Sequence, residues 1–167
     1  MSDDLPYRPN VGAVLFRRDG HVLVCRRAGL PPNHAEQTGW QWPQGGIDAG
    51  EDPAKAVTRE LREEIGTDHA TIIGEHPEWL NYDFPPDIQV LGGSKGRFRG
   101  QRQKWFALRF DGTDADIRLD TQKHVEFDAW RWELLSVAAL RVVAWKRPVY
   151  MAVAAEFERF SQPHGDR

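Results

Sequence analysis

Residues 45–67 of the chain read GGIDAGEDPAKAVTRELREEIGT, and the second half of this run has the pattern of an amphipathic helix. Pro53 is favoured at the first helical position, Asp52 can cap the helix, and Gly66 stands where a helix often ends in a left-handed residue. The pattern therefore predicts a helix over residues 53–65. Its buried side is expected to consist of apolar residues three and four positions apart, namely Ala54, Val57, Leu61 and Ile65.

Three glutamates of this helix are expected on one face. At 100° per residue Glu60 and Glu64 lie one turn apart and Glu63 lies beside them, next to the apolar stripe. The carboxylates should therefore be half sheltered at the edge of the core. A cation would offset their charge there, and oxygen ligands without His or Cys suit Mg²⁺, Mn²⁺ or Ca²⁺. The alternative is a solvated acidic surface paired with Arg59 and Arg62, and the helix alone leaves both interpretations open.

The rest of the chain predicts a mixed sheet with flanking helices, an α/β or α+β sandwich. Short apolar runs at 11–16 and 22–25 surround Asp19-Gly20, a pair typical of a β-hairpin turn. Tyr82 lies in one of the later strand-like segments. Further strands are expected around 71–73, 79–84, 103–110 and 125–132, loops around 28–39 and 85–100, and a last helix over 147–160 with Val149, Val153, Phe157 and Phe160 on its buried side.

Composition and charge exclude several classes of protein. The 167 residues contain 22 Lys and Arg against 25 Asp and Glu, a net charge of −3. This balance argues against coating nucleic acid by bulk electrostatics, although a few phosphates could still be held at one site. The single cysteine, Cys25, excludes an internal disulfide framework and a cysteine-based zinc site. The chain has no apolar run of membrane-spanning length and an acidic N-terminus, so we expect one cytoplasmic domain over residues 1–167, with a core at about 6–160 and no membrane contact.

The glycine and charged positions of the 45–67 run recur at a defined spacing: Gly45, Glu51, Arg59-Glu60, Glu63-Glu64 and Gly66. This spacing resembles the signature of the Nudix hydrolases, and Thr67 departs from it only at a packing position. The resemblance implies an α/β/α sandwich with a mixed sheet and flanking helices. It also implies a loop–helix–loop that binds divalent cations, Mg²⁺ with Mn²⁺ as an alternative, and that hydrolyses a nucleoside diphosphate linked to another group.

Segments outside the signature extend the resemblance over most of the chain. Residues 7–12 (YRPNVG), 40–46 (WQWPQGG), 103–106 (QKWF) and 126–132 (EFDAWRW) look like the bacterial RNA pyrophosphohydrolases and the closely similar dinucleoside-polyphosphate hydrolases. In that subfamily the acid at the position of Glu126 completes the metal site from outside the signature.

The resemblance implies roles for the signature residues. Arg59 would pair with Glu51 to brace the loop, and a carboxylate not saturated by metal would take the proton of the attacking water. We favour Glu63 as this base, although the sequence does not separate it from Glu60 or Glu64. The implied metal ligands are the carbonyl of Gly45 and the carboxylates of Glu60, Glu63, Glu64 and Glu126.

Substrate contacts are expected from cations and aromatic residues. Trp145 followed by Lys146 joins a stacking ring to a charge, a combination that can hold an unpaired base and its phosphate; the alternative for Trp145 is core packing. Tyr82 is either a second stacking residue or an ordinary strand residue. The basic run 95–104 would steer or contact phosphate. With the positions that the resemblance adds, the expected substrate residues are Arg8, Arg27, Tyr82, Lys104, Val143, Trp145 and Lys146.

The leading functional hypothesis is a metal-dependent pyrophosphohydrolase that removes pyrophosphate from the 5′ end of triphosphorylated RNA. The second is a hydrolase of dinucleoside polyphosphates such as diadenosine tetraphosphate, since the loop 28–39 beside Arg27 looks longer than in the familiar RNA enzymes. The third is a catalytically inactive nucleotide sensor, which the retained glutamates disfavour. The sequence does not identify a protein partner.

Overall fold

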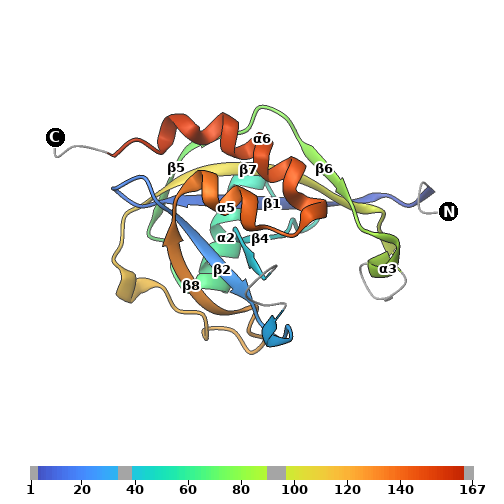
Figure 1. The fold of residues 1–167 in the computed structure, drawn as a ribbon, viewed down its shortest axis with the longest axis horizontal. Helices are drawn as coiled ribbons and strands as arrows, with labels where there is room; N and C mark the ends of the chain where they lie inside the picture. The colour runs from blue at the N-terminus through green and yellow to red at the C-terminus, as the bar shows by residue number, and fades with distance from the viewer. Residues whose placement is uncertain (1–3, 34–38, 90–96, 164–167) are drawn as a thin grey trace.

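The computed structural model describes residues 4–33, 39–89 and 97–163, and within these ranges eight strands form one mixed sheet (Figure 1). The main path is β3-β2-β1-β7-β5, with β4 paired to β1, β6 to β7 and β8 to β2. The pairing of β1 with β7 is parallel and the other pairings are antiparallel. The strands are β1 (Tyr7–Phe16), β2 (Val22–Arg27), β3 (Trp40–Gln41), β4 (Gln44–Gly46), β5 (Ala70–Glu75), β6 (Leu80–Asp83), β7 (Gly100–Phe110) and β8 (Phe127–Glu133).

Helices pack on both faces of the sheet. One face carries α2 (Pro53–Ile65), and the other carries α5 (Leu135–Arg141) and α6 (Arg147–Phe157), as Figure 1 shows. Successive strand residues point to opposite faces, so Ala13 of β1 packs with α2 and Val14 packs with α5 and α6. Each face thus has its own buried apolar cluster, which confirms the α/β/α sandwich. Shorter helical segments include α3 (Pro86–Gln89) and 3₁₀ turns at Asp114–Asp116, Ala144–Lys146 and Glu158–Phe160.

The helix predicted over residues 53–65 is present with those bounds as α2. Gly66 ends it in the left-handed region, with φ of 74°. Asp52 occupies the N-cap position, but its side chain makes no capping hydrogen bond. The buried stripe consists of Ala56, Val57, Leu61 and Ile65. It therefore differs from the expected stripe at one position, since Ala56 is buried and Ala54 is only partly buried.

Some elements differ from the sequence-based expectation. The seven-residue helix α5 was not expected, because it is too short for a clear periodic pattern and has no side-chain cap. The last helix ends at Phe157 and continues as a 3₁₀ turn. The expected loop 85–100 contains α3, and residues 90–96 and 34–38 lie outside the described ranges. In the part of the chain that is described, no helix is long and apolar enough to cross a membrane.

The strand pairing brings distant segments together around β1. This strand lies between β4 on one side and β7 on the other, so that Asn10 is opposite both Gly46 and Gln103. β4 leads through a short loop directly into α2, which packs against β1 and β4. The glutamate-bearing part of α2 is thereby held beside the strand that carries Arg8 and Asn10.

Candidate active site

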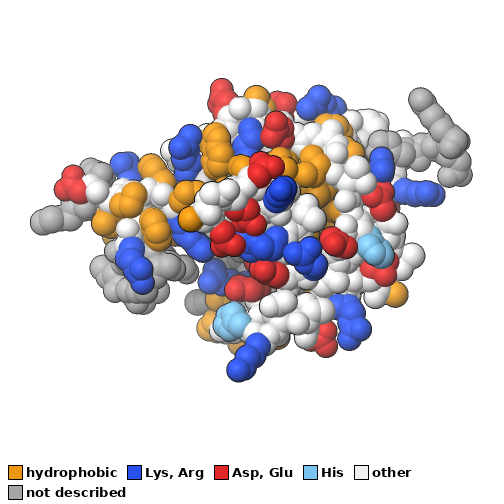
Figure 2. Space-filling view, turned by 180° about the vertical axis from the view of Figure 1, so that it is seen from behind, with side chains coloured by type: hydrophobic (Ala, Val, Ile, Leu, Met, Phe, Trp, Pro, Cys, Tyr) orange, Lys and Arg blue, Asp and Glu red, His pale blue; other side chains and the backbone are white. Residues whose placement is uncertain are grey.

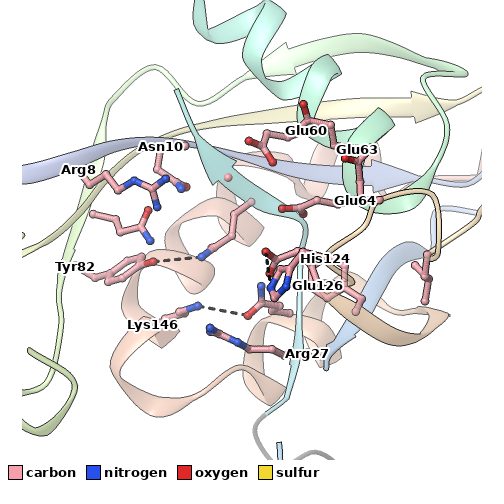
Figure 3. A pocket seen from close by; sticks show the side chains of 18 of the residues that line it. Arg8, Asn10, Arg27, Glu60, Glu63, Glu64, Tyr82, His124, Glu126 and Lys146 are labelled. Atoms are coloured by element: carbon pink, nitrogen blue, oxygen red, sulfur yellow. Dashed lines mark hydrogen bonds and ion pairs between the residues drawn. The ribbon is translucent and has the colours of Figure 1, made fainter. Parts of the chain in front are cut away.

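A cavity of about 620 Å³ collects charged residues from distant parts of the chain. Glu60, Glu63 and Glu64 of α2 line one side of it, which we call the acidic wall (Figure 3). Across the cavity lies a basic wall, formed by Arg8, Arg27 and Lys146. In the opposite view of the whole molecule, acidic and basic side chains lie next to one another across the middle of the surface (Figure 2).

The glutamates of the acidic wall differ in burial. Glu63 has 41% of its side chain exposed, against 12% for Glu60, and Glu64 has a buried Oε2 atom without a hydrogen-bond partner. Burial, followed by the nearby charge of Glu60, raises the pKa of Glu64 well above its usual range. Burial also raises the pKa of Glu60. Both groups are therefore disposed to hold a proton when no cation is bound.

Arg59 ties the loop that precedes α2 to the acidic wall. Its guanidinium donates to both carboxylate oxygens of Glu51, at 2.9 and 2.8 Å, and to the carbonyl of Gly46 at 2.9 Å. It also donates to Glu60 Oε1 at 3.0 Å and to Glu63 Oε2 at 3.1 Å. Hydrogen bonding to Arg59 lowers the pKa of Glu51 to about 2. The expected pairing of Arg59 with Glu51 is therefore present, as a two-pronged ion pair.

Two glycines of β4 let side chains from both walls approach the backbone closely. A Cβ atom on Gly45 would overlap the carboxyl group of Glu60, and one on Gly46 would overlap the guanidinium of Arg8. Glycine at both positions therefore leaves room for these side chains where they now lie. The sequence singled out Gly45 for its carbonyl; the structure adds that its missing side chain is what makes room for Glu60.

Glu126 lies just before β8 and lines the same cavity as the α2 glutamates. Its charge is one of the causes that raise the pKa of Glu64. His124 stands beside it, with Nε2 3.9 Å from Glu126 Oε1 (Figure 3). His124 was not among the predicted site residues, and neither were its neighbours Gln122 and Lys123, which also line the cavity. Their only sequence signal was a position two to four residues before Glu126.

The residues of the acidic wall fit a divalent cation by their chemistry. Their donors are oxygen atoms alone, as Mg²⁺ and Mn²⁺ prefer, and the buried Oε2 of Glu64 lacks the partner that a cation would supply. Within the described ranges, no three His, Cys, Asp or Glu side chains are arranged as a metal-binding group. Two of the three α2 glutamates, Glu60 and Glu63, accept hydrogen bonds from Arg59. The metal-ligand roles remain predictions.

Lys146 is the most enclosed cation of the basic wall. It is only 5% exposed, and its Nζ lies 3.4 Å from Gln41 Oε1. The same atom lies 5.8 Å from the ring centre of Tyr82 and 5.2 Å from that of Trp145, distances at which a cation is attracted to a ring face. Of the predicted substrate residues, Arg8, Arg27, Tyr82, Trp145 and Lys146 all line the cavity.

The two aromatic candidates belong to a packed cluster at the edge of the cavity. Trp145 makes edge-to-face contacts with Tyr82 and Phe84, with ring centres 5.3 and 6.0 Å apart. Tyr82 is 6% exposed, whereas Trp145 is only partly buried. The ring of Trp145 thus packs on its neighbours and also lines the cavity. Its stacking on a base stays a prediction.

Two predicted substrate residues, Lys104 and Val143, are not among those that line the cavity. Lys104 Nζ instead donates to the carbonyl of His76 at 2.6 Å and lies 3.8 Å from Glu75. Two other cations of the basic run also contact residues outside the cavity lining. Arg99 pairs with Asp83 at 3.0 Å, Arg102 lies over the ring of Trp79 at 4.9 Å, and Lys95 falls outside the described residues.

Comparison with known proteins places this geometry in a family. The NUDIX domain matches residues 6–153. The chain is 60% identical to the RNA pyrophosphohydrolase of Acidiphilium cryptum over 162 residues, which cover 96% of each protein. It is 56% identical to the RNA pyrophosphohydrolase of Gluconacetobacter diazotrophicus over 164 residues, again 96% of each.

Solved structures share the fold at lower identity. The dihydroneopterin triphosphate pyrophosphohydrolase of E. coli aligns with a TM-score of 0.61 and 19% identity, over 90% of this chain and 99% of that one. The C. elegans Ap4A hydrolase in a binary complex aligns with a TM-score of 0.60 and 22% identity, over 91% and 98%. The signature, the sandwich fold and the match over residues 6–153 together show that the chain belongs to the NUDIX domain family.

Proposed function

We propose that this chain is an RNA pyrophosphohydrolase that removes pyrophosphate from the 5′ end of triphosphorylated RNA and leaves a 5′-monophosphate. The observation that carries the proposal is the 60% identity, over 96% of both chains, to a relative of that name. The cavity supports it, because a triphosphate needs an acidic wall for cations facing a basic wall for its own charge. The chain would act as one domain, in the cytoplasm where such RNA is made.

The basic wall would bind the phosphate groups of the substrate. Arg8 and Arg27 present guanidinium groups, which match phosphate oxygens in pairs. Lys146 is buried among polar and aromatic neighbours, so its charge is screened little by solvent. Trp145 beside it would stack on the first base. These contacts would leave the phosphorus atom that reacts facing the acidic wall.

The Gly45 carbonyl and the carboxylates of Glu60, Glu63, Glu64 and Glu126 would hold Mg²⁺ or Mn²⁺. When bound, such cations neutralise phosphate charge and make a water molecule more acidic. Glu63 is our proposed proton acceptor for that water, because its side chain is more open to solvent than those of Glu60 and Glu64. Arg59 would position Glu60 and Glu63 through the contacts described above.

A direct comparison of substrates tests the proposal. The purified chain with Mg²⁺ or Mn²⁺ is given a triphosphorylated RNA oligonucleotide and, in parallel, diadenosine tetraphosphate. We expect release of pyrophosphate from the RNA and a higher kcat/KM for it. A clear preference for the dinucleotide would assign the chain to the second hypothesis, and nucleotide binding without turnover of either would assign it to the sensor hypothesis.

A further inference from the structure

A hydrogen-bonded chain of buried side chains lies behind the cavity. Parallel pairing of β1 with β7 sets Asn10 opposite Gln103 and Gly12 opposite Trp105. A Cβ atom on Gly12 would overlap the indole of Trp105, so glycine at this position makes room for the ring. Gln103 and Trp105 are each 0% exposed, and neither of them lines the cavity.

The indole of Trp105 sets the direction of this chain, because its N–H can only donate. It donates to Gln103 Oε1 at 3.0 Å, so the carbonyl of the Gln103 amide faces the indole and the NH₂ group faces away. A reversed amide would set NH₂ against the indole N–H, two donors in a buried place, and each would lack an acceptor. The donor-only chemistry of the indole therefore fixes the orientation of the Gln103 amide.

The NH₂ group of Gln103 in turn orients two residues of the cavity. It donates to Asn10 Oδ1 at 2.8 Å and to Gln44 Oε1 at 3.1 Å, and both Asn10 and Gln44 line the cavity. Since both carbonyls are turned to Gln103, both NH₂ groups lie on the other branch of their amides. That of Gln44 donates to the Tyr82 hydroxyl at 3.3 Å, at the cavity edge (Figure 3).

We propose that Trp105 and Gln103 are positioning residues for the reaction: they hold Asn10 and Gln44 with their NH₂ groups toward the cavity, where these bind phosphate oxygens of the substrate. This inference rests on the proposed function, which supplies a triphosphate as the ligand. Phosphate oxygens only accept hydrogen bonds, so amide N–H groups that face the cavity attract them, whereas carbonyl groups in the same place would repel them.

The position of these amides fits a phosphate chain that lies between the two walls. Asn10 is two residues from Arg8 and opposite Gly46 on β4, and Gln44 directly precedes Gly45. Asn10 and Gln44 therefore lie near the place where the residues of the basic wall approach those of the acidic wall. Neutral donors at this place bind phosphate without adding positive charge, which would compete with a divalent cation for the glutamates.

A matched pair of tryptophan variants tests the role of the indole donor. Trp42 is also 0% exposed, its ring centre lies 5.6 Å from that of Trp105, and its Nε1 has no hydrogen-bond partner among the residues that the structure describes. Trp105→Phe and Trp42→Phe thus remove the same atoms from one core, but only the first removes a hydrogen bond. We expect Trp105→Phe to raise KM for triphosphorylated RNA about tenfold, with kcat within about threefold, because one buried hydrogen bond is lost. Trp42→Phe should leave KM within about twofold.

Gln103→Glu tests the direction of the hydrogen bonds between Gln103 and the two cavity amides. A carboxylate can still accept from the indole, but its second oxygen offers Asn10 and Gln44 an acceptor instead of a donor, so both amides must turn their carbonyls toward the cavity. KM should rise at least as far as in Trp105→Phe. The affinity of each variant for inorganic tripolyphosphate, measured by calorimetry in the presence of Mg²⁺, should fall in parallel.

Equal rises of KM in Trp105→Phe and Trp42→Phe would overturn the proposal, because they would show an effect of packing alone. An unchanged tripolyphosphate affinity in folded Gln103→Glu would overturn it as well. If Gln103→Glu fails to fold, the tryptophan pair decides. If the wild-type chain binds tripolyphosphate but does not hydrolyse RNA, the proposed function fails, while the affinities of the variants still decide the role of Trp105 and Gln103.

Discussion

Glu64 places a carboxyl group in a site that favours its protonated form when no cation is present. The raised pKa means that folding takes up a proton near neutral pH, because the unfolded chain leaves this group ionised. We predict that Glu64→Gln raises the melting temperature of the metal-free protein at pH 8 by about 2–4 °C, the size expected for roughly 1 kcal/mol in a chain of this length. The same change should lower kcat at least about a hundredfold, since an implied metal ligand is lost.

Glu78→Gln is the control for this prediction, because Glu78 is exposed and lies outside the cavity. It should change neither the melting temperature at pH 8 nor the activity. Thermal unfolding with EDTA and turnover with Mg²⁺ are the two measurements. A destabilised Glu64→Gln protein with full activity would contradict both the burial argument and the metal-ligand assignment.

A second prediction concerns Gly45 and Gly46, because a methyl group on Gly45 would meet the acidic wall and one on Gly46 would meet the basic wall. Gly45→Ala would push against the carboxyl group of Glu60, and Gly46→Ala against the guanidinium of Arg8. Both neighbours are the ends of flexible side chains, so the fold should be kept. We expect Gly45→Ala mainly to lower kcat and Gly46→Ala mainly to raise KM, each about tenfold or more. Steady-state kinetics on triphosphorylated RNA distinguish the two, and the same pattern in both variants would contradict the division into two walls.

At the scale of elements, the loop before α2 depends on the forked guanidinium of Arg59. Lysine offers a single point of charge and cannot reach Glu51, the Gly46 carbonyl and the α2 glutamates together. We predict that Arg59→Lys lowers kcat about tenfold or more, because a misplaced catalytic group costs about that much, and that it also lowers the melting temperature.

Arg62→Lys is the matched control on the same helix. Arg62 is 58% exposed on its side chain and makes only a 3.8 Å ion pair with Asp68, an interaction worth little at a surface. It should behave like the wild type in turnover and in thermal unfolding. If Arg59→Lys and Arg62→Lys are indistinguishable in both measurements, the loop does not depend on the fork.

A feature could be predicted from the sequence where it depends on residues that lie close together in the chain. The bounds of α2 and the common face of its glutamates depend on residues within two turns, so spacing alone was sufficient. The absence of Lys104 from the cavity lining could not be predicted, because strand pairing decides where its side chain points. Lys104 lies in β7 and reaches the His76 carbonyl, a partner 28 residues away that no local pattern indicates.

The hydrogen-bonded amides behind the cavity could not be predicted for the same reason. Asn10, Gln44 and Gln103 lie on three strands that meet only once β1 is placed between β4 and β7. Nothing in their spacing marks them as partners, and glutamine is an unremarkable residue in a strand. Lys123 and His124 were missed for a related reason, since only the path of their segment beside Glu126 brings them to the cavity.

At the scale of the whole molecule, the net charge of −3 conceals a separation of charge. The acidic wall and the basic wall face each other across one cavity, and Arg59, on the same helix as the acidic wall, neutralises part of it. A cation that binds the glutamates therefore competes with Arg59 and with protonation of Glu60 and Glu64, whose pKa values are raised. Metal affinity, stability and pH are thus linked in this protein.

This linkage predicts how stability depends on pH. The raised pKa values of Glu60 and Glu64 mean that the folded state binds more protons than the unfolded state above about pH 4.5, near the ordinary pKa of glutamate. Their contribution is therefore complete below that pH and is lost as pH rises. Groups with lowered pKa values, such as Glu51 and Asp83, act only at lower pH. We expect the melting temperature of the EDTA-treated protein to fall between pH 5.5 and 8.5, and Mg²⁺ to raise it more at pH 8.5 than at pH 5.5. Calorimetric scans at both pH values test this, and a melting temperature that rises with pH in EDTA would show that the buried glutamates do not control stability.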